Sequence, residues 1–194
     1  RLPAGTHELL VQCSEGAAQR PMQPQCVRSA RCWSRPGLLQ PPDLANPKPG
    51  AKVLDACAGN GGKSLCLAAL MRGRGELIAN HYRMSEYREL KQRLRSFRLQ
   101  NVRQIQPGGR IPDTPFDLIL VDVPCSGTGV IRRNPDLIYR LAQVDYGEFA
   151  ARQFALLEKY ARYLAPGGRL VYTTCSLIGA ENRVRMARSA LNNL

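Results

Sequence analysis

Short apolar runs alternate with helical patterns from Lys52 to Thr173, and this alternation limits the fold more than any other feature. Runs with strand propensity occupy residues 52–57, 76–79, 102–105, 116–121 and 169–173. Helical patterns fall between them at 63–71, 84–98 and 146–164. Strands that alternate with helices form parallel βαβ units. The sequence therefore predicts an α/β fold with a doubly wound, mostly parallel sheet of five strands, whose ligands bind beyond the carboxyl ends of the strands.

Residues 1–50 have a different texture, with eight prolines and no sustained period of two or 3.6 residues. We expect a Pro/Arg-rich arm at 1–50, followed by one principal domain at 51–194. Arg20, Arg28, Arg31 and Arg35 give the arm a basic character. Two interpretations stay open, the remnant of an organellar presequence and an RNA-binding arm.

The net charge of +13 favours a polyanionic partner, and nucleic acid is the first candidate. Of the 28 cationic residues, 23 are arginine, which binds phosphate bidentately and stacks on bases. A basic surface that only aids solubility, or an organellar bias in composition, is the alternative. We expect a soluble, intracellular protein without a membrane segment, because no apolar run approaches the ~20 residues that span a bilayer. The seven cysteines, odd in number and without a CxxC pair, predict reduced thiols and no metal site.

Three loops follow predicted strands and carry residues suited to chemistry. The first, at 58–63, is a glycine loop that opens a helix and on its own is also typical of a tight turn. The second places Asp122 and Cys125 after the strongest strand, although a free cysteine is often only a small buried apolar residue. The third places Cys175 after the strand expected to lie beside it. Two thiols and a carboxylate are therefore predicted to meet at one edge of the sheet.

The stretches VLDACAGNGGKS, FDLILVDVPCSGTGVIRRNPD and LAPGGRLVYTTCSLIGAEN carry a family resemblance. In order and spacing they resemble the cofactor loop, the PC motif and the TC motif of the S-adenosylmethionine-dependent RNA cytosine-C5 methyltransferases of the NSUN/Fmu (RsmB) type. The resemblance covers about residues 50–185. It implies a Rossmann-like class I methyltransferase fold, here incomplete at the C-terminus because the family's final strand pair is absent from the sequence.

The resemblance also implies a mechanism and its residues. Cys175 of the TC motif would add to C6 of cytosine, and Cys125 of the PC motif would serve the release of the C5 proton. Asp122 would act at N3 as a protonated carboxyl group or another donor, and Lys63 would contact the base. Arginines near the thiols would lower their pKa or hold phosphates. The arginines considered for these two tasks are Arg132 and Arg133.

The family pattern places S-adenosylmethionine on the first loop and the ends of two strands. The implied cofactor contacts are Cys57, Ala58, Gly59, Asn60, Gly61, Gly62, Lys63, His81 and Asp122. Three positions depart from the pattern: His81 stands where the family has an acidic residue, Gly108 where it has a second one, and Asn60 where it has proline. Loss of two carboxylate contacts would weaken cofactor binding on the order of a hundredfold. The alternative function is therefore an RNA-binding or ribosome-assembly scaffold without catalysis.

The expected partner is RNA, in the first place ribosomal RNA. Arg88, Lys91 and Arg95 share one face of the helix predicted at 84–98, which would follow phosphates or form an ordinary solvated face. Mitochondrial members of the family act on ribosomal RNA together with a helical-repeat protein. The arginine-rich composition favours such a mitochondrial member, with that kind of partner, over a cytoplasmic or nucleolar one.

Overall fold

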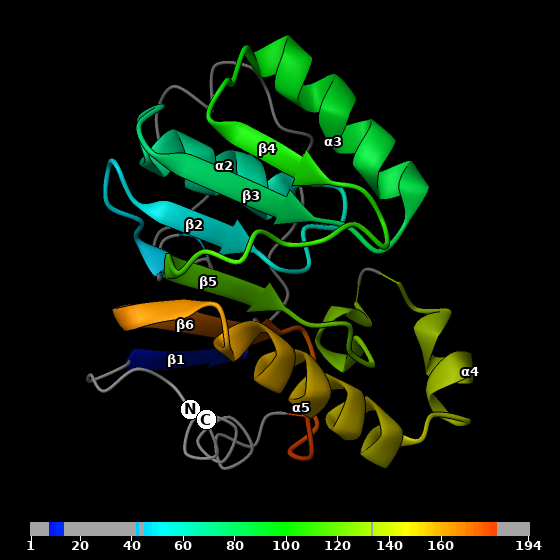
Figure 1. The fold of residues 1–194 in the computed structure, drawn as a ribbon. Coiled ribbons are helices and arrows are strands. Elements are labelled where there is room, and N and C mark those ends of the chain that lie inside the picture. Colours follow the sequence, from blue (N-terminus) through cyan, green and yellow to red (C-terminus); the bar gives the residue numbers. More distant parts are fainter. Residues whose placement is uncertain (1–7, 14–41, 43–44, 133, 182–194) are drawn as a thin grey trace.

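The computed structural model describes residues 8–13, 42, 45–132 and 134–181, and its centre is one parallel sheet (Figure 1). The strands lie in the order β1-β6-β5-β2-β3-β4, and every neighbouring pair is parallel. The strands are β1 (Glu8–Cys13), β2 (Lys52–Asp55), β3 (Glu76–Asn80), β4 (Val102–Ile105), β5 (Phe116–Asp122) and β6 (Leu164–Thr174). The helices are α2 (Gly62–Leu70), α3 (Met84–Phe97), α4 (Leu137–Leu141) and α5 (Tyr146–Ala161), with a short 3-10 helix, η3 (Thr128–Val130).

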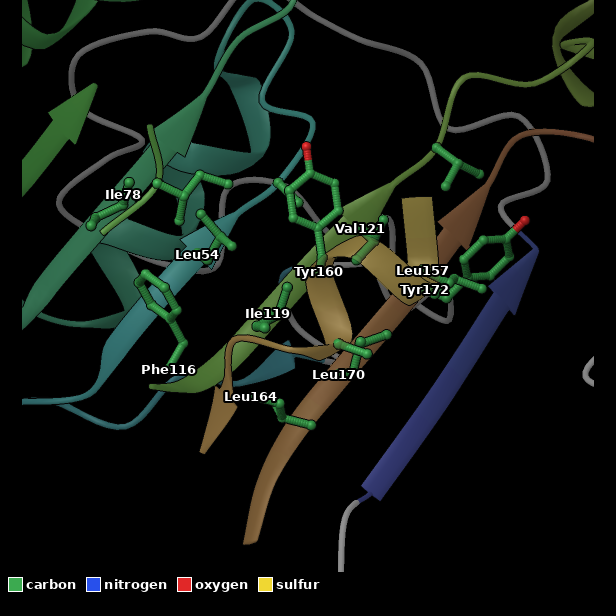
Figure 2. Close-up of a cluster of buried hydrophobic side chains, with 14 of the residues drawn as sticks. Leu54, Ile78, Phe116, Ile119, Val121, Leu157, Tyr160, Leu164, Leu170 and Tyr172 are labelled. Carbon is green, nitrogen blue, oxygen red and sulfur yellow. The ribbon is translucent and has the colours of Figure 1, made fainter. Parts of the chain in front are cut away.

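Helices cover both faces of the sheet, which explains the continuous apolar strands. On one face, α5 packs Leu157 and Tyr160 against strand residues such as Ile119 (Figure 2). On the other face, α2 and α3 contribute residues such as Leu65 and Leu90 to a second buried cluster. Successive residues of β5 alternate between the two clusters, as strand geometry requires. The structure thus confirms the predicted α/β fold. Burial on both faces of the sheet fixes the strand register.

The order in which strands are added across the sheet reverses between β2 and β5, the two strands at its centre. From β2 the chain proceeds outward through β3 to β4 and then returns to β5 on the other side. Ligands bind in such sheets outside the carboxyl ends of the strands at this switch point. Figure 1 shows η3 and α4 beyond the carboxyl end of β5, so the loops of interest share one edge.

Two local features differ from the sequence prediction. Glu8–Cys13 forms a sixth strand that pairs with β6, within a segment for which no periodicity predicted a strand. Residues 166–168, between the helix expected at 146–164 and the strand expected at 169–173, form a bulge inside β6, where the pairing shifts between Phe116–Leu164 and Leu118–Arg169. Gly167 takes the left-handed conformation there, with φ 72°. The division of the chain at residue 50 stays a prediction, since most of residues 1–44 lie outside the described residues.

None of the helices in the described ranges combines the length and apolar character that crossing a bilayer requires. The same ranges contain no group of three or more His, Cys, Asp or Glu side chains arranged to hold a metal ion.

Candidate active site

The two motif cysteines meet at the carboxyl edge of the sheet. Cys125 lies in the loop after β5, and Cys175 directly follows β6, whose Thr173 is paired with Asp122 of β5. The two sulfur atoms lie 2.9 Å apart, and both side chains are half-buried. Because β5 and β6 are neighbouring parallel strands, the residues that follow them are brought together by the sheet itself. The predicted convergence of the two thiols is therefore present.

The two thiols ionise as a pair. A hydrogen bond from Cys175, assisted by the Thr174 hydroxyl and by the backbone N–H groups of Cys175 and Gly127, lowers the pKa of Cys125 to about 6 despite its burial. The same contact with Cys125 raises the pKa of Cys175, so the pair readily loses one proton but not two. Hydrogen-bond donors produce this shift.

Lys63 and Asp122 form a salt bridge next to this pair. The Lys63 ammonium donates to Asp122 Oδ2 at 2.5 Å, and the Thr173 hydroxyl donates to Asp122 Oδ1 at 2.7 Å. Burial lowers the pKa of Lys63, but Asp122 more than offsets this and raises the pKa above its ordinary value. Both carboxyl oxygens thus accept hydrogen bonds, which differs from the protonated donor considered for Asp122 at N3. The ammonium of Lys63 is the group that retains N–H donors for a substrate.

The glycine loop opens α2 with its backbone tightly packed. Gly61 precedes the helix with φ 80°, and a methyl group on it would lie 2.3 Å from Cδ1 of Leu90. Only glycine fits such a position, so the loop backbone packs closely against Leu90 of α3. Free N–H groups at a helix N-terminus, reached through a loop with small side chains, favour a ligand with polar and charged groups.

His81 lies at the end of β3 and faces the glycine loop. Its side chain is 1% exposed, and Nδ1 lies 3.1 Å from the carbonyl oxygen of Gly59. A carbonyl oxygen only accepts, so Nδ1 carries the proton and Nε2 is an acceptor. Burial lowers the pKa of His81, which keeps the ring neutral at pH 7. Within the described residues, neither Nε2 of His81 nor the buried Oε1 of Gln104 has a hydrogen-bond partner. These two acceptors fit a ligand that donates hydroxyl groups, and the ribose of S-adenosylmethionine has such hydroxyl groups.

Comparison with known proteins identifies the family. The model of a family described as 16S rRNA methyltransferase RsmB/F matches residues 43–193. The chain belongs to the RsmB/F family. It is 37% identical over 150 residues to the "Probable ribosomal RNA small subunit methyltransferase B" of Synechocystis sp., which covers 75% of this chain and 34% of the relative. It is 38% identical over 138 residues to the "Ribosomal RNA small subunit methyltransferase F" of Cronobacter sakazakii, which covers 69% of this chain and 28% of that protein.

Solved structures agree with the RsmB/F assignment. A methyltransferase homolog from Pyrococcus horikoshii has a TM-score of 0.65 and 35% identity, covering 79% of this chain and 48% of that one. The structure described as NSun6 from Pyrococcus horikoshii with SFG has a TM-score of 0.66 and 25% identity, covering 78% and 40%. The chain thus has the class I methyltransferase fold. It spans about a third of the length of its curated RsmB/F relatives, and the expected mitochondrial origin finds no support among these bacterial and archaeal proteins.

Of the basic residues predicted to contact RNA, the four that the structure describes lie on exposed surfaces of this RsmB/F domain. Arg88, Lys91 and Arg95 are exposed on α3, and none of the three forms a salt bridge within the described residues. Lys91 and Arg95 also line an open pocket of about 400 Å³ between the end of α3 and β4. Arg132 is exposed after η3, whereas Arg133 lies outside the described residues.

Sequence reasoning missed one residue that the structure places at the centre of the site. Glu181 is 1% exposed and accepts hydrogen bonds from the loops of both cysteines. It belongs to the stretch LIGAEN at the end of the TC-motif stretch, but nothing in its local pattern predicts a buried carboxylate.

Asn80, the last residue of β3, has a structural role. Its amide donates to the carbonyl oxygen of Ala56 and to the hydroxyl of Tyr160 at 3.0 Å each.

Proposed function

We propose that this chain transfers a methyl group from S-adenosylmethionine to C5 of a cytosine in RNA, with ribosomal RNA as the substrate class. The observation that carries the proposal is the contact of Cys125 and Cys175 beside the Lys63–Asp122 salt bridge. The substrate class rests on the names of the relatives, which are ribosomal RNA small subunit methyltransferases. We assign the catalysis to residues 51–194, and the arm at 1–50 to contacts outside the reacting base.

The first step is the addition of Cys175 to the cytosine ring, in which the proton of the Cys175 thiol passes to the Cys125 thiolate and from there to solvent as the sulfur bonds to C6. C5 of cytosine is a weak nucleophile, and a thiolate bonded to C6 turns the C5=C6 bond into an electron-rich centre at C5. Lys63 favours the thiolate of Cys175 because its positive charge lowers the pKa of that thiol, against the opposing effect of Cys125. The same ammonium is positioned to donate a hydrogen bond to the ring atoms, O2 and N3, on which negative charge develops.

The second step restores the aromatic ring. S-adenosylmethionine, when bound, supplies the methyl group as a sulfonium electrophile. Once C5 carries both the methyl group and its proton, Cys125 takes the proton, the electron pair re-forms the C5=C6 bond, and the sulfur of Cys175 leaves C6. The Thr174 hydroxyl and the backbone N–H of Gly127 stabilise the Cys125 thiolate even after Cys175 has bonded to the ring. These donors keep Cys125 available as a base for the C5 proton.

Residues 57–63 and His81 would hold the cofactor. The backbone of the loop and the N-terminus of α2 provide N–H groups, and Asp122 faces the same edge as a carboxylate for the cofactor's ammonium group. Nε2 of His81 would accept one ribose hydroxyl in place of the family's acidic residue. A neutral acceptor replaces a charged one, which predicts weaker cofactor binding than an acidic residue would give.

The direct test is to incubate the purified chain with methyl-labelled S-adenosylmethionine and a small-subunit ribosomal RNA transcript, and then to separate the nucleosides. The expected product is 5-methylcytidine, and Cys175→Ala is expected to abolish it. Cys66→Ala removes a buried thiol in α2, away from the reacting pair, and serves as the matched control. Absence of cofactor binding at millimolar concentration in calorimetry would overturn the proposal.

A second candidate function is an RNA-binding scaffold without catalysis, and the observation that favours it is the replacement of the acidic residue by His81. A scaffold would bind ribosomal RNA equally well with and without the Cys175 thiol. Equal RNA affinity of the wild type and Cys175→Ala, together with no labelled nucleoside from the wild type, would select this alternative.

A further inference from the structure

We propose that Glu181 is the positioning residue of the catalytic pair, a single carboxylate that holds the loops of Cys125 and Cys175 in register. The catalytic consequence rests on the function proposed above, but the geometric claim does not. Glu181 lies six residues beyond Cys175, at the end of the stretch that resembles the TC motif.

The carboxylate contacts the residue next to each cysteine. Oε1 accepts from the hydroxyl of Ser126 at 2.5 Å and from the hydroxyl of Ser176 at 2.6 Å. Ser126 follows Cys125 and Ser176 follows Cys175, so one oxygen atom joins both loops immediately beside the sulfurs. The two hydroxyls also lie 3.0 Å from each other. Displacement of either loop would therefore break a contact that the other loop shares.

The second oxygen fixes this junction to the body of the domain. Oε2 accepts from the backbone N–H of Ser126 and from the side-chain amide of Gln153, each at 2.9 Å. Gln153 belongs to α5, and its amide also donates to the carbonyl oxygen of Pro124 at 3.0 Å. The hydroxyl of Tyr172 in β6 lies 3.0 Å from both Oε1 of Gln153 and the carbonyl oxygen of Glu181. The loops are thus held against a helix and a strand, which are the rigid parts of the fold.

The Glu181 side chain has the hydrogen-bonding capacity that this positioning role needs. A carboxylate accepts about four hydrogen bonds and donates none, and here four donors point at it. Burial raises the pKa of Glu181, but the hydrogen bonds from Ser126, Ser176 and Gln153 lower it below the ordinary value. No salt bridge neutralises this carboxylate within the described residues. A buried charge is costly to retain, so its persistence at the junction of two catalytic loops indicates a positional role.

The test compares Glu181→Gln and Glu181→Ala with Glu148→Gln, an exposed glutamate of α5 that pairs with Arg152. The first measurement needs neither cofactor nor RNA. Diamide takes two electrons and two protons from the Cys125 and Cys175 thiols and leaves a disulfide, which peptide mapping by mass spectrometry identifies. The rate of this coupling reports how often the two sulfurs are in contact. The second measurement is the single-turnover rate and KM of methyl transfer.

We expect Glu181→Ala to slow disulfide coupling at least tenfold and to lower kcat about a hundredfold, with KM for RNA and cofactor nearly unchanged, because a displacement of about 1 Å has that effect on reacting groups. Glu181→Gln keeps the size and one acceptor oxygen and should recover part of both losses. Glu148→Gln should behave as the wild type. Melting curves confirm that the compared proteins are folded.

If Glu181→Ala fails to fold, the double variant Ser126→Ala/Ser176→Ala replaces it, since it removes the contacts of Oε1 and leaves those of Oε2. A folded variant of either kind that couples its thiols at the wild-type rate would overturn the proposal. Loss of coupling in a protein whose wild type methylates no RNA would support the role of Glu181 and reject the proposed methyl transfer. The two proposals therefore fail separately.

Discussion

The carboxyl edge of the sheet has two halves that differ in how completely their polar groups are paired. One half is formed by the loops after β5 and β6, and the other by the ends of β2, β3 and β4. Around Cys125 and Cys175, the side chains of Asp122, Ser126 and Glu181 all form hydrogen bonds with described residues. The other half contains Asp55 Oδ1, His81 Nε2 and Gln104 Oε1, which are buried and form no hydrogen bond with the part of the chain that the structure describes. The reacting groups are thus organised before anything binds, whereas the neighbouring half retains acceptors for a ligand.

The largest effect should come from the paired half. Lys63→Gln removes the ammonium that favours the Cys175 thiolate and faces the developing charge on the base. We expect a loss in kcat of about 10²–10³, the scale for removing one positioned donor. Single-turnover methyl transfer measures it, with Lys52→Gln as control, since Lys52 pairs with Glu76 at the opposite edge of the sheet. A loss confined to KM would mean that Lys63 only binds substrate.

The next effect concerns Asp55, whose pKa is raised to about 6 by burial, partly offset by the hydrogen bond from Ser64. The folded chain therefore holds this proton more tightly than the unfolded chain does. The stabilisation is fully present below pH 4 and is lost as the pH rises through about 6. Asp55→Asn should remove this slope and raise the free energy of unfolding at pH 7 by about 3 kcal/mol.

Urea unfolding at several pH values measures the Asp55 effect. Asp113→Asn, at an exposed position, makes the same chemical change and should leave the slope in place. An unchanged slope in Asp55→Asn would show that another group titrates in this range.

A smaller effect is expected at His81. His81→Asn keeps an N–H donor for the Gly59 carbonyl and removes the acceptor Nε2. Loss of one neutral hydrogen bond should weaken cofactor binding by about three- to tenfold in calorimetry with S-adenosylhomocysteine. Wild-type affinity should be constant from pH 7 to 8 and fall at acidic pH, because protonation turns Nε2 into a donor. Glu86, whose charge favours that protonation, and Tyr87, whose ring lies 5.8 Å away, are the neighbours in α3.

Equal affinity of the wild type and His81→Asn at pH 7.5 would remove His81 from the cofactor site. It would also weaken the contrast between the two halves, because the unpaired acceptor would then serve no ligand.

The smallest effect per residue is expected on α3. Each of Arg88→Gln, Lys91→Gln and Arg95→Gln should lower RNA affinity a fewfold and reduce the salt dependence of binding by about one phosphate contact. Filter binding at several salt concentrations measures both quantities. Arg74→Gln, at the opposite edge of the sheet before β3, makes the same change in charge and is the control. Equal losses at Arg74 would mean that only net charge matters.

The sequence predicted what depends on local pattern and parallel topology. Strand periodicity placed Asp122 and Cys125 after one strand and Cys175 after its neighbour, and parallel strands end at the same edge. It could not predict β1, because that strand is defined by pairing with β6, which lies about 160 residues away. The role of Glu181 could not be predicted for a similar reason. Its hydrogen-bond partners are far apart in the sequence, and hydrogen bonds between loops leave no periodic pattern. The proton on Nδ1 of His81 likewise follows from the position of Gly59 alone.

The central claim is that Cys175 bonds to the base and Cys125 releases it. The most direct test is to mix each protein with S-adenosylmethionine and RNA that contains 5-fluorocytidine, whose C5 has no removable proton, and to look for a covalent protein–RNA complex by denaturing electrophoresis. The account predicts a complex with the wild type, a complex with Cys125→Ala even on unmodified RNA, and none with Cys175→Ala. A stable complex formed by Cys175→Ala but not by Cys125→Ala would contradict it.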